Sequence, residues 1–193
     1  MSKKLLCILL GLNLFWAFSA TIYDWQAIQN IPFFYWPIII VCPIFPLLLA
    51  ILWYLKSRNG KVNQFYLSII AIISFSYGLG SLFFYPTIMH YNGFDWLNFG
   101  QIFWVWFYAS QGLYLLVKEK GNIWGEVVGI SIFSVSVWVQ IRTNSFGYLD
   151  YSTIPREILN FEFIGLIILI LLVFVFKYLF SVYKQLSNSL NIK

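Results

Sequence analysis

The sequence predicts an all-α bundle of six transmembrane helices, and three observations lead to that fold. The 193 residues are 61% hydrophobic and only 10% charged, whereas a soluble domain carries about a quarter charged residues. Six apolar stretches are each long enough to cross a hydrocarbon core of about 30 Å, which takes roughly 20 helical residues. Ten of the twelve Lys and Arg residues lie in every second gap between those stretches, a pattern that keeps basic loops in the cytoplasm.

The apolar stretches define the expected order of the chain, as one transmembrane domain. Spans are expected near residues 5–23, 33–55, 64–88, 97–117, 122–141 and 159–183. Basic residues precede the first span and follow the second, fourth and sixth, so both termini of this cell-membrane protein are expected in the cytoplasm. The longest polar segment, residues 143–157, then faces the outside together with His90 and Asp95.

The first stretch also fits a second interpretation. Lys3 and Lys4, the apolar run and the small-residue segment 17–20 are typical of a cleavable signal peptide. Asn13, Trp16 and Tyr23 suit a retained helix better. Cleavage would remove one span and leave the orientation of the others unchanged.

The charge and motif content narrows the classes of partner and chemistry. The net charge is +5, but the basic residues flank apolar spans, so membrane lipids are the expected partner and nucleic acid is not. A single histidine and two cysteines without ligand spacing predict neither a metal site nor a cofactor. No nucleophile–base pair or recognised catalytic motif can be assembled, so no catalytic residue is assigned and enzymatic activity is not expected.

Prolines interrupt the second stretch and suggest a broken helix. Pro37 opens this span, and Pro43 and Pro46 lie in its middle. A proline inside a helix removes a backbone donor and clashes with the preceding turn, and the freed carbonyls need partners within the membrane. Discontinuous helices of this kind form ligand or ion sites in transporters. The favoured alternative is a packed kink that only shapes the bundle.

Polar side chains in the central spans form the candidate ligand site. Spacings of three, four and three residues put four of them on one face of the fourth span, and amides at membrane depth are costly unless paired. We therefore expect this face to point into the bundle. There it would either line a polar cavity enclosed by spans two to five or belong to a hydrogen-bond network without a ligand. The candidate residues are Tyr77, Gln101, Trp104, Tyr108, Gln111 and Gln140.

Small and charged residues near the fifth span have simpler explanations. Gly125 and Gly129 form a GxxxG pair, which favours close helix packing in lipid. Glu126 lies about one turn into the span, where a carboxylate is expected to stay solvated or to pair with a nearby cation. Lys177 and Lys184 in the last helix are expected to extend toward the cytoplasmic headgroups.

Several short motifs follow one another along the chain: Thr21-Ile22-Tyr23, Pro43 and Pro46, Tyr77-Gly78, Gln111-Gly112-Leu113-Tyr114 and the segment from Gly147 to Pro155. Their order resembles a family of small six-helix prokaryotic membrane proteins of unknown function. In some Gram-positive bacteria the genes of this family lie beside those of menaquinol–cytochrome c reductase, so the resemblance implies a respiratory context. Acidic, histidine and asparagine residues of the family are replaced here by Ile44 or Phe45, Val105 and residues 138–140.

Two functions remain as hypotheses. The first is a non-catalytic accessory or assembly subunit of a membrane complex, which fits the packing motifs, the missing catalytic motifs and the family resemblance. The second is a small transporter, or a lipid- or small-molecule-binding protein, that uses the proline-rich second span and the polar face of the fourth. A centre in which the amides bond to one another would argue against the second.

Overall fold

A computed structural model describes residues 3–29, 41–58, 61–94, 96–143, 145–146, 149–150 and 152–190. Within these residues the fold is helical, as the composition predicts, and each predicted span corresponds to one helix. The helices are α1 (Lys3–Ile28), α3 (Val41–Ser57), α4 (Gln64–Asn92), α5 (Trp96–Lys118), α6 (Ile123–Thr143) and α7 (Arg156–Leu190). The short strands β1 (Ser145–Phe146) and β2 (Leu149–Asp150) pair antiparallel between α6 and α7.

Three of the described helices are long and apolar enough to cross a membrane. They are α4, α6 over Ile123–Arg142, and α7 over Arg156–Ser187. The apolar parts of α1 and α3, Lys4–Ser19 and Ile44–Ser57, are shorter. These lengths support a membrane protein with three candidate spans.

The described part of the proline-rich stretch forms one continuous helix, without the break that the sequence predicted at Pro43 and Pro46. α3 is continuous from Val41 to Ser57 and contains Pro46. Pro43 lies in the first turn, where backbone N–H groups have no partner inside the helix, so its missing donor costs little. Pro37 lies outside the described residues.

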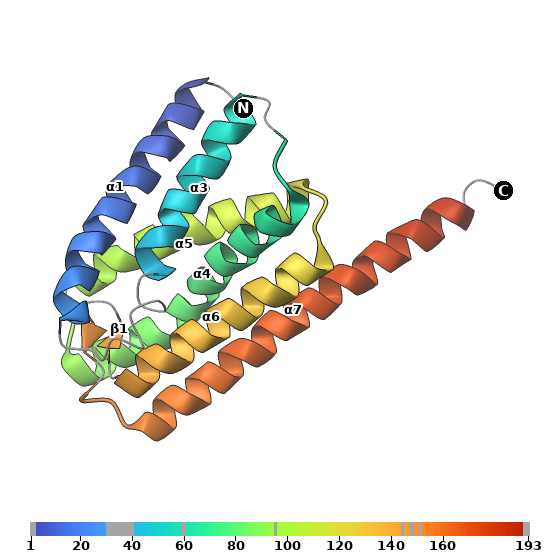
Figure 1. The fold of residues 1–193 in the computed structure, drawn as a ribbon. Helices are drawn as coiled ribbons and strands as arrows, with labels where there is room; N and C mark the ends of the chain where they lie inside the picture. Colours follow the sequence, from blue (N-terminus) through green and yellow to red (C-terminus); the bar gives the residue numbers. More distant parts are fainter. Residues whose placement is uncertain are drawn as a thin grey trace.

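The helices form two groups, and α3 packs against α4 where the groups meet (Figure 1). α1 and α3 lie side by side as one pair, while α4 lies between α5 and α6, and α7 runs along α6. α4 is the most enclosed of the candidate spans, with 67% of its apolar window buried, whereas the window of α7 is only 11% buried. The main core therefore surrounds α4, and α7 covers one side of it.

The ends of α4 and α6 are set by local hydrogen bonds and one glycine. The Asn63 side chain accepts a hydrogen bond from the Phe65 amide at 2.9 Å and caps the start of α4. Gly93 ends α4 with a φ of 84°, a conformation that glycine adopts without strain. Asn122 caps α6 by accepting from the Gly125 amide at 3.0 Å. These caps place Asn122 and Glu126 beside the start of α4.

Glycines bring α5 and α6 into close contact with opposite sides of α4. A Cβ atom on Gly112 of α5 would lie 2.6 Å from the Phe75 amide nitrogen of α4. On the other side, a Cβ atom on Gly129 of α6 would lie 3.2 Å from the Ile69 Cα atom, and one on Gly125 would overlap the Phe65 carbonyl. The packing role predicted for the GxxxG pair is confirmed, with α4 as its partner.

Replacing Gly112 with alanine is expected to destabilise the protein by about 1–3 kcal/mol, because the new methyl group forces the α4 backbone away. Gly100→Ala is the matched control on the same helix, since nothing lies within 4 Å of a Cβ atom there. The control should be neutral or stabilising by up to about 1 kcal/mol, as alanine favours helix. Unfolding by SDS in mixed micelles, followed by circular dichroism, measures both. Equal stability of the two variants would contradict the close contact.

Candidate functional site

The most polar buried site in the described residues centres on Gln111 of α5. Its Oε1 atom accepts hydrogen bonds from the Asn13 amide of α1 at 2.9 Å and from the Trp53 indole N–H of α3 at 2.8 Å. Its Nε2 atom donates to Asn13 Oδ1 at 3.2 Å and to the Phe107 carbonyl at 3.4 Å. Both acceptor positions and both donor positions of the glutamine are therefore used within the protein.

Burial makes these hydrogen bonds important for stability. Asn13 is fully buried, Trp53 is 3% exposed and Gln111 is 4% exposed. An amide in such a place costs free energy unless it is paired. The three side chains come from three helices, so the cluster joins α1 and α3 to α5. We call Asn13, Trp53 and Gln111 the amide cluster.

Aromatic rings extend the amide cluster along α5. Trp16 of α1 stacks on Trp104, with ring centroids 5.4 Å apart, and meets the edge of Tyr108 at 6.0 Å. Trp104, Tyr108 and Gln111 therefore share the face of α5 that the spacing predicted. That face packs against α1 and α3, and the amides at its end bond to one another.

Two other candidate residues, Tyr77 and Gln140, lie away from the amide cluster. Tyr77 of α4 packs edge-on against Phe133 of α6, with ring centroids 5.2 Å apart. Gln140 is fully buried on α6, seventeen residues or about 26 Å from the start of that helix. Gln111 is only seven residues, about 10 Å, from the end of α5 that adjoins this start. The two amides thus lie at different depths. The Gln101 side chain is not among those described.

A small cavity adjoins Tyr77 between α4, α5 and α6. Its volume is about 20 Å³, and its lining includes Ser81, Val105 and Phe133. The Ser81 hydroxyl donates to the Gly78 carbonyl of its own helix at 2.7 Å. This volume holds about one water molecule, and the mostly apolar lining offers few groups that could orient a ligand.

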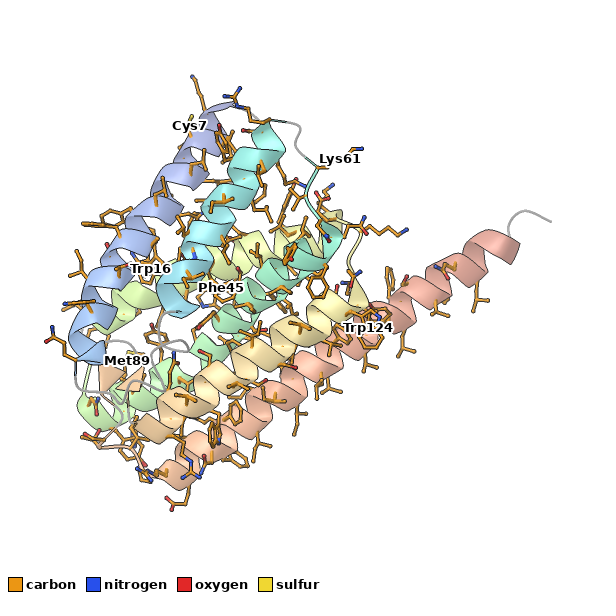
Figure 2. All side chains as sticks on the ribbon, viewed as in Figure 1. Cys7, Trp16, Phe45, Lys61, Met89 and Trp124 are labelled. Carbon is orange, nitrogen blue, oxygen red and sulfur yellow. The ribbon has the colours of Figure 1, made fainter. Side chains whose placement is uncertain are left out.

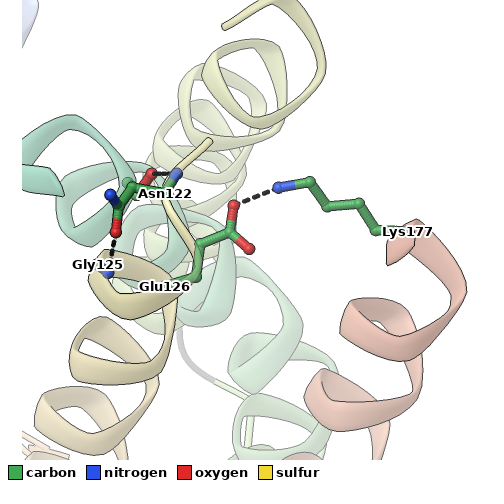
Figure 3. Close-up of polar contacts among 5 residues, drawn as sticks. Asn122, Gly125, Glu126 and Lys177 are labelled. Atoms are coloured by element: carbon green, nitrogen blue, oxygen red, sulfur yellow. Dashed lines mark hydrogen bonds and ion pairs between the residues drawn. The ribbon is translucent and has the colours of Figure 1, made fainter. Parts of the chain in front are cut away.

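A buried ion pair connects α6 to α7 at the end of the bundle where α6 begins. Glu126 is fully buried and pairs with Lys177 of α7, whose side chain is 35% exposed. Figure 3 shows this pair beside the Asn122 cap, whose backbone N–H donates to the Ser68 hydroxyl of α4 at 2.8 Å. The sequence predicted that Glu126 would either stay solvated or pair with a nearby cation, and the structure has the pair.

Other polar contacts lie near the two ends of the bundle. Lys56 of α3 pairs with Glu119, directly after α5. At the opposite end the Thr87 hydroxyl donates to Glu162 of α7. Figure 2 shows Lys61 and Cys7 at the first end and Met89 at the second. In the described part of the chain no three His, Cys, Asp or Glu side chains gather as metal ligands.

Most of the residues that pair in the amide cluster and the ion pairs could not be identified as partners from the sequence. Asn13 gave a usable signal, because an amide in an apolar span needs a partner. Trp53 gave none, since a tryptophan near a span end is ordinary in a membrane protein. The sequence predicts that Lys177 extends toward the headgroups, whereas the helix arrangement pairs it with Glu126.

Gln111→Leu is expected to destabilise the protein by about 1–3 kcal/mol, because it leaves the Asn13 amide and the Trp53 N–H buried without their acceptor. Replacing Asn13 and Gln111 together by leucine should cost less than the sum of the two single changes. Val117→Leu, at a 74% exposed position on the same helix, is the control. SDS unfolding of all four variants gives the coupling energy, and additive losses would contradict the cluster.

Lys177→Met is expected to destabilise the protein by about 3 kcal/mol, because it leaves the buried Glu126 carboxylate without its cation. Adding Glu126→Gln should recover part of that loss. Lys56→Met is the matched control: it also removes a lysine from an ion pair, but its pair is 26% and 33% exposed, so the cost should stay below about 1 kcal/mol. The same unfolding assay measures each variant, and equal losses for the two lysines would contradict the difference in burial.

Comparisons with known proteins leave the interpretation to the geometry. The chain matches no protein-family model, no curated protein and no solved structure.

Proposed function

We propose that the chain is a multi-pass cell-membrane protein with six spans and both termini in the cytoplasm. The alternation of basic residues supports this orientation. Lys56 and Lys177 belong to ion pairs near one end of the bundle, the end at which α6 begins. On α7, Arg156 and Lys177 bound 22 residues, or about 33 Å of helix, which matches a hydrocarbon core of about 30 Å.

Within the membrane, the proposed role is that of a non-catalytic accessory or assembly subunit of a larger complex. The observation that carries this proposal is the complete use of the Gln111 amide in bonds to Asn13, Trp53 and its own helix. Side chains that bind a ligand keep donors or acceptors directed at the ligand, and this amide has none left over. The amide cluster therefore serves to join helices.

The exposed surface and the family resemblance point in the same direction. A transporter needs a polar cavity of ligand size, and the cavity beside Tyr77 has room for about one water molecule. Large apolar side chains cover much of the outside of α1 and α7, which suits contact with lipid and with other membrane subunits. The resemblance makes a respiratory complex the first one to test.

The proposal predicts that the chain purifies with at least one other membrane protein in fixed stoichiometry. Native membranes are solubilised in a mild detergent, the tagged chain is captured, and partners are quantified by mass spectrometry. A tagged membrane protein of similar size and expression level serves as the control for nonspecific capture. Deleting the gene should also lower the amount of the assembled complex. A chain that is recovered without any other protein, in cells whose complexes are unchanged by the deletion, would contradict the proposal.

A further inference from the structure

α7 is longer than the membrane requires. Its 35 residues span about 52 Å at 1.5 Å per residue, and Lys177 marks the point where it pairs with the start of α6. Thirteen further residues, 178–190, continue the helix for about 20 Å. Figure 1 shows this part, in red, projecting past the ends of α4, α5 and α6.

An apolar stripe with a seven-residue repeat runs along α7 into the projecting part. Its members follow one another at alternating distances of four and three residues, and each is between 51% and 63% exposed. Such spacing places all of them on one face of a helix and is the pattern of a coiled-coil seam. The seam residues are Ile168, Leu172, Val175, Leu179, Val182 and Leu186.

The seam faces away from the rest of the protein. Ile170, which is 1% exposed, and Lys177, which bonds to Glu126, lie on the side of α7 that contacts the bundle. With leucines 172, 179 and 186 at heptad position a, Ile170 and Lys177 occupy position f, opposite the seam. The contacts of α7 with the bundle therefore lie on the side of the helix opposite the seam.

The flanks of the seam suit a second copy of the same chain. Identical charges beside a parallel seam repel each other, because each copy presents the same side chain at the same level. Positions e and g beside the seam hold Phe176, Tyr178, Tyr183 and Gln185, which carry no charge at neutral pH. Lys177 and Lys184 both fall at position f. The Lys177 charge, which is paired with Glu126, is thus kept off the contact.

We propose that the seam joins copies of this chain through a parallel coiled coil that begins in the membrane and extends beyond it. This inference rests on the proposed topology, since a common orientation in the membrane makes the helices parallel. Leucine at position a with Ile or Val at position d favours three or four strands over two. The association therefore brings together three or four copies.

The driving force comes from the part of the seam outside the hydrocarbon core. Lipid chains cover Ile168, Leu172 and Val175 as well as another helix does. Leu179, Val182 and Leu186 lie beyond Lys177, where water surrounds them unless another apolar surface covers them. A seam of this length is weak between free peptides, but confinement to one membrane raises the effective concentration of the copies.

Two substitutions of neighbouring exposed residues test the seam. Leu179 is 63% exposed and belongs to it, whereas Phe180 is 61% exposed and lies outside it. Light scattering in mild detergent measures the mass of the full-length protein. The wild type and Phe180→Lys should have three or four times the chain mass of 22.7 kDa. Leu179→Lys should have the mass of one chain. A single-chain wild type, or a Leu179→Lys protein with the wild-type mass, overturns the proposal.

Crosslinking in native membranes provides the second measurement. In a background with Cys7→Ser and Cys42→Ser, Val182→Cys should form disulfide-linked dimers on mild oxidation, while the neighbouring Ser181→Cys should form at least tenfold fewer. Equal crosslinking of both overturns the seam. The same Val182→Cys protein should react with a membrane-impermeant maleimide only after lysis. Labelling in intact cells contradicts the proposed topology alone, whatever the crosslinking result.

Discussion

The close approach of α5 and α6 to α4 is the constraint on which the rest of the bundle depends. Gly112 and Gly129 allow backbones to meet where any side chain would separate them. In lipid there is little hydrophobic gain from bringing helices together, so dispersion contacts at short distance must stabilise the bundle. Once α4 is enclosed in this way, α7 needs only the remaining side of the core, and most of its surface stays uncovered.

The α1–α3 pair is attached by apolar packing of α3 on α4 and, in addition, by a different kind of contact with α5. Long side chains, namely the amide cluster and the rings of Trp16 and Trp104, fill the space between this pair and α5. Hydrogen bonds fix directions that apolar packing alone leaves loose. The protein thus combines a tightly packed group of helices with a helix pair whose side chains form hydrogen bonds and aromatic contacts with that group.

Much of the helical architecture could be predicted from the sequence, because apolar length and small-residue spacing are local signals. The shared face of Trp104, Tyr108 and Gln111 was also predictable from helical periodicity. The identity of their partners was not, since Asn13 lies 98 residues from Gln111 and only the tertiary arrangement brings them together. The break predicted at Pro43 is absent from α3, because a proline in a first turn looks the same in the sequence as one inside a helix.

The hydrogen bonds between Asn13 and Gln111 have a consequence for the synthesis of the protein. Ribosomes add about 5–20 residues per second, so the 98 residues between the two side chains take roughly 5–20 s to synthesise. During that interval α1 has already left the ribosome, and its amide has no partner from α5. In the proposed six-span topology, the first helix must therefore be sheltered by the insertion machinery, or stay near the water interface, until the fourth predicted span has entered the bilayer.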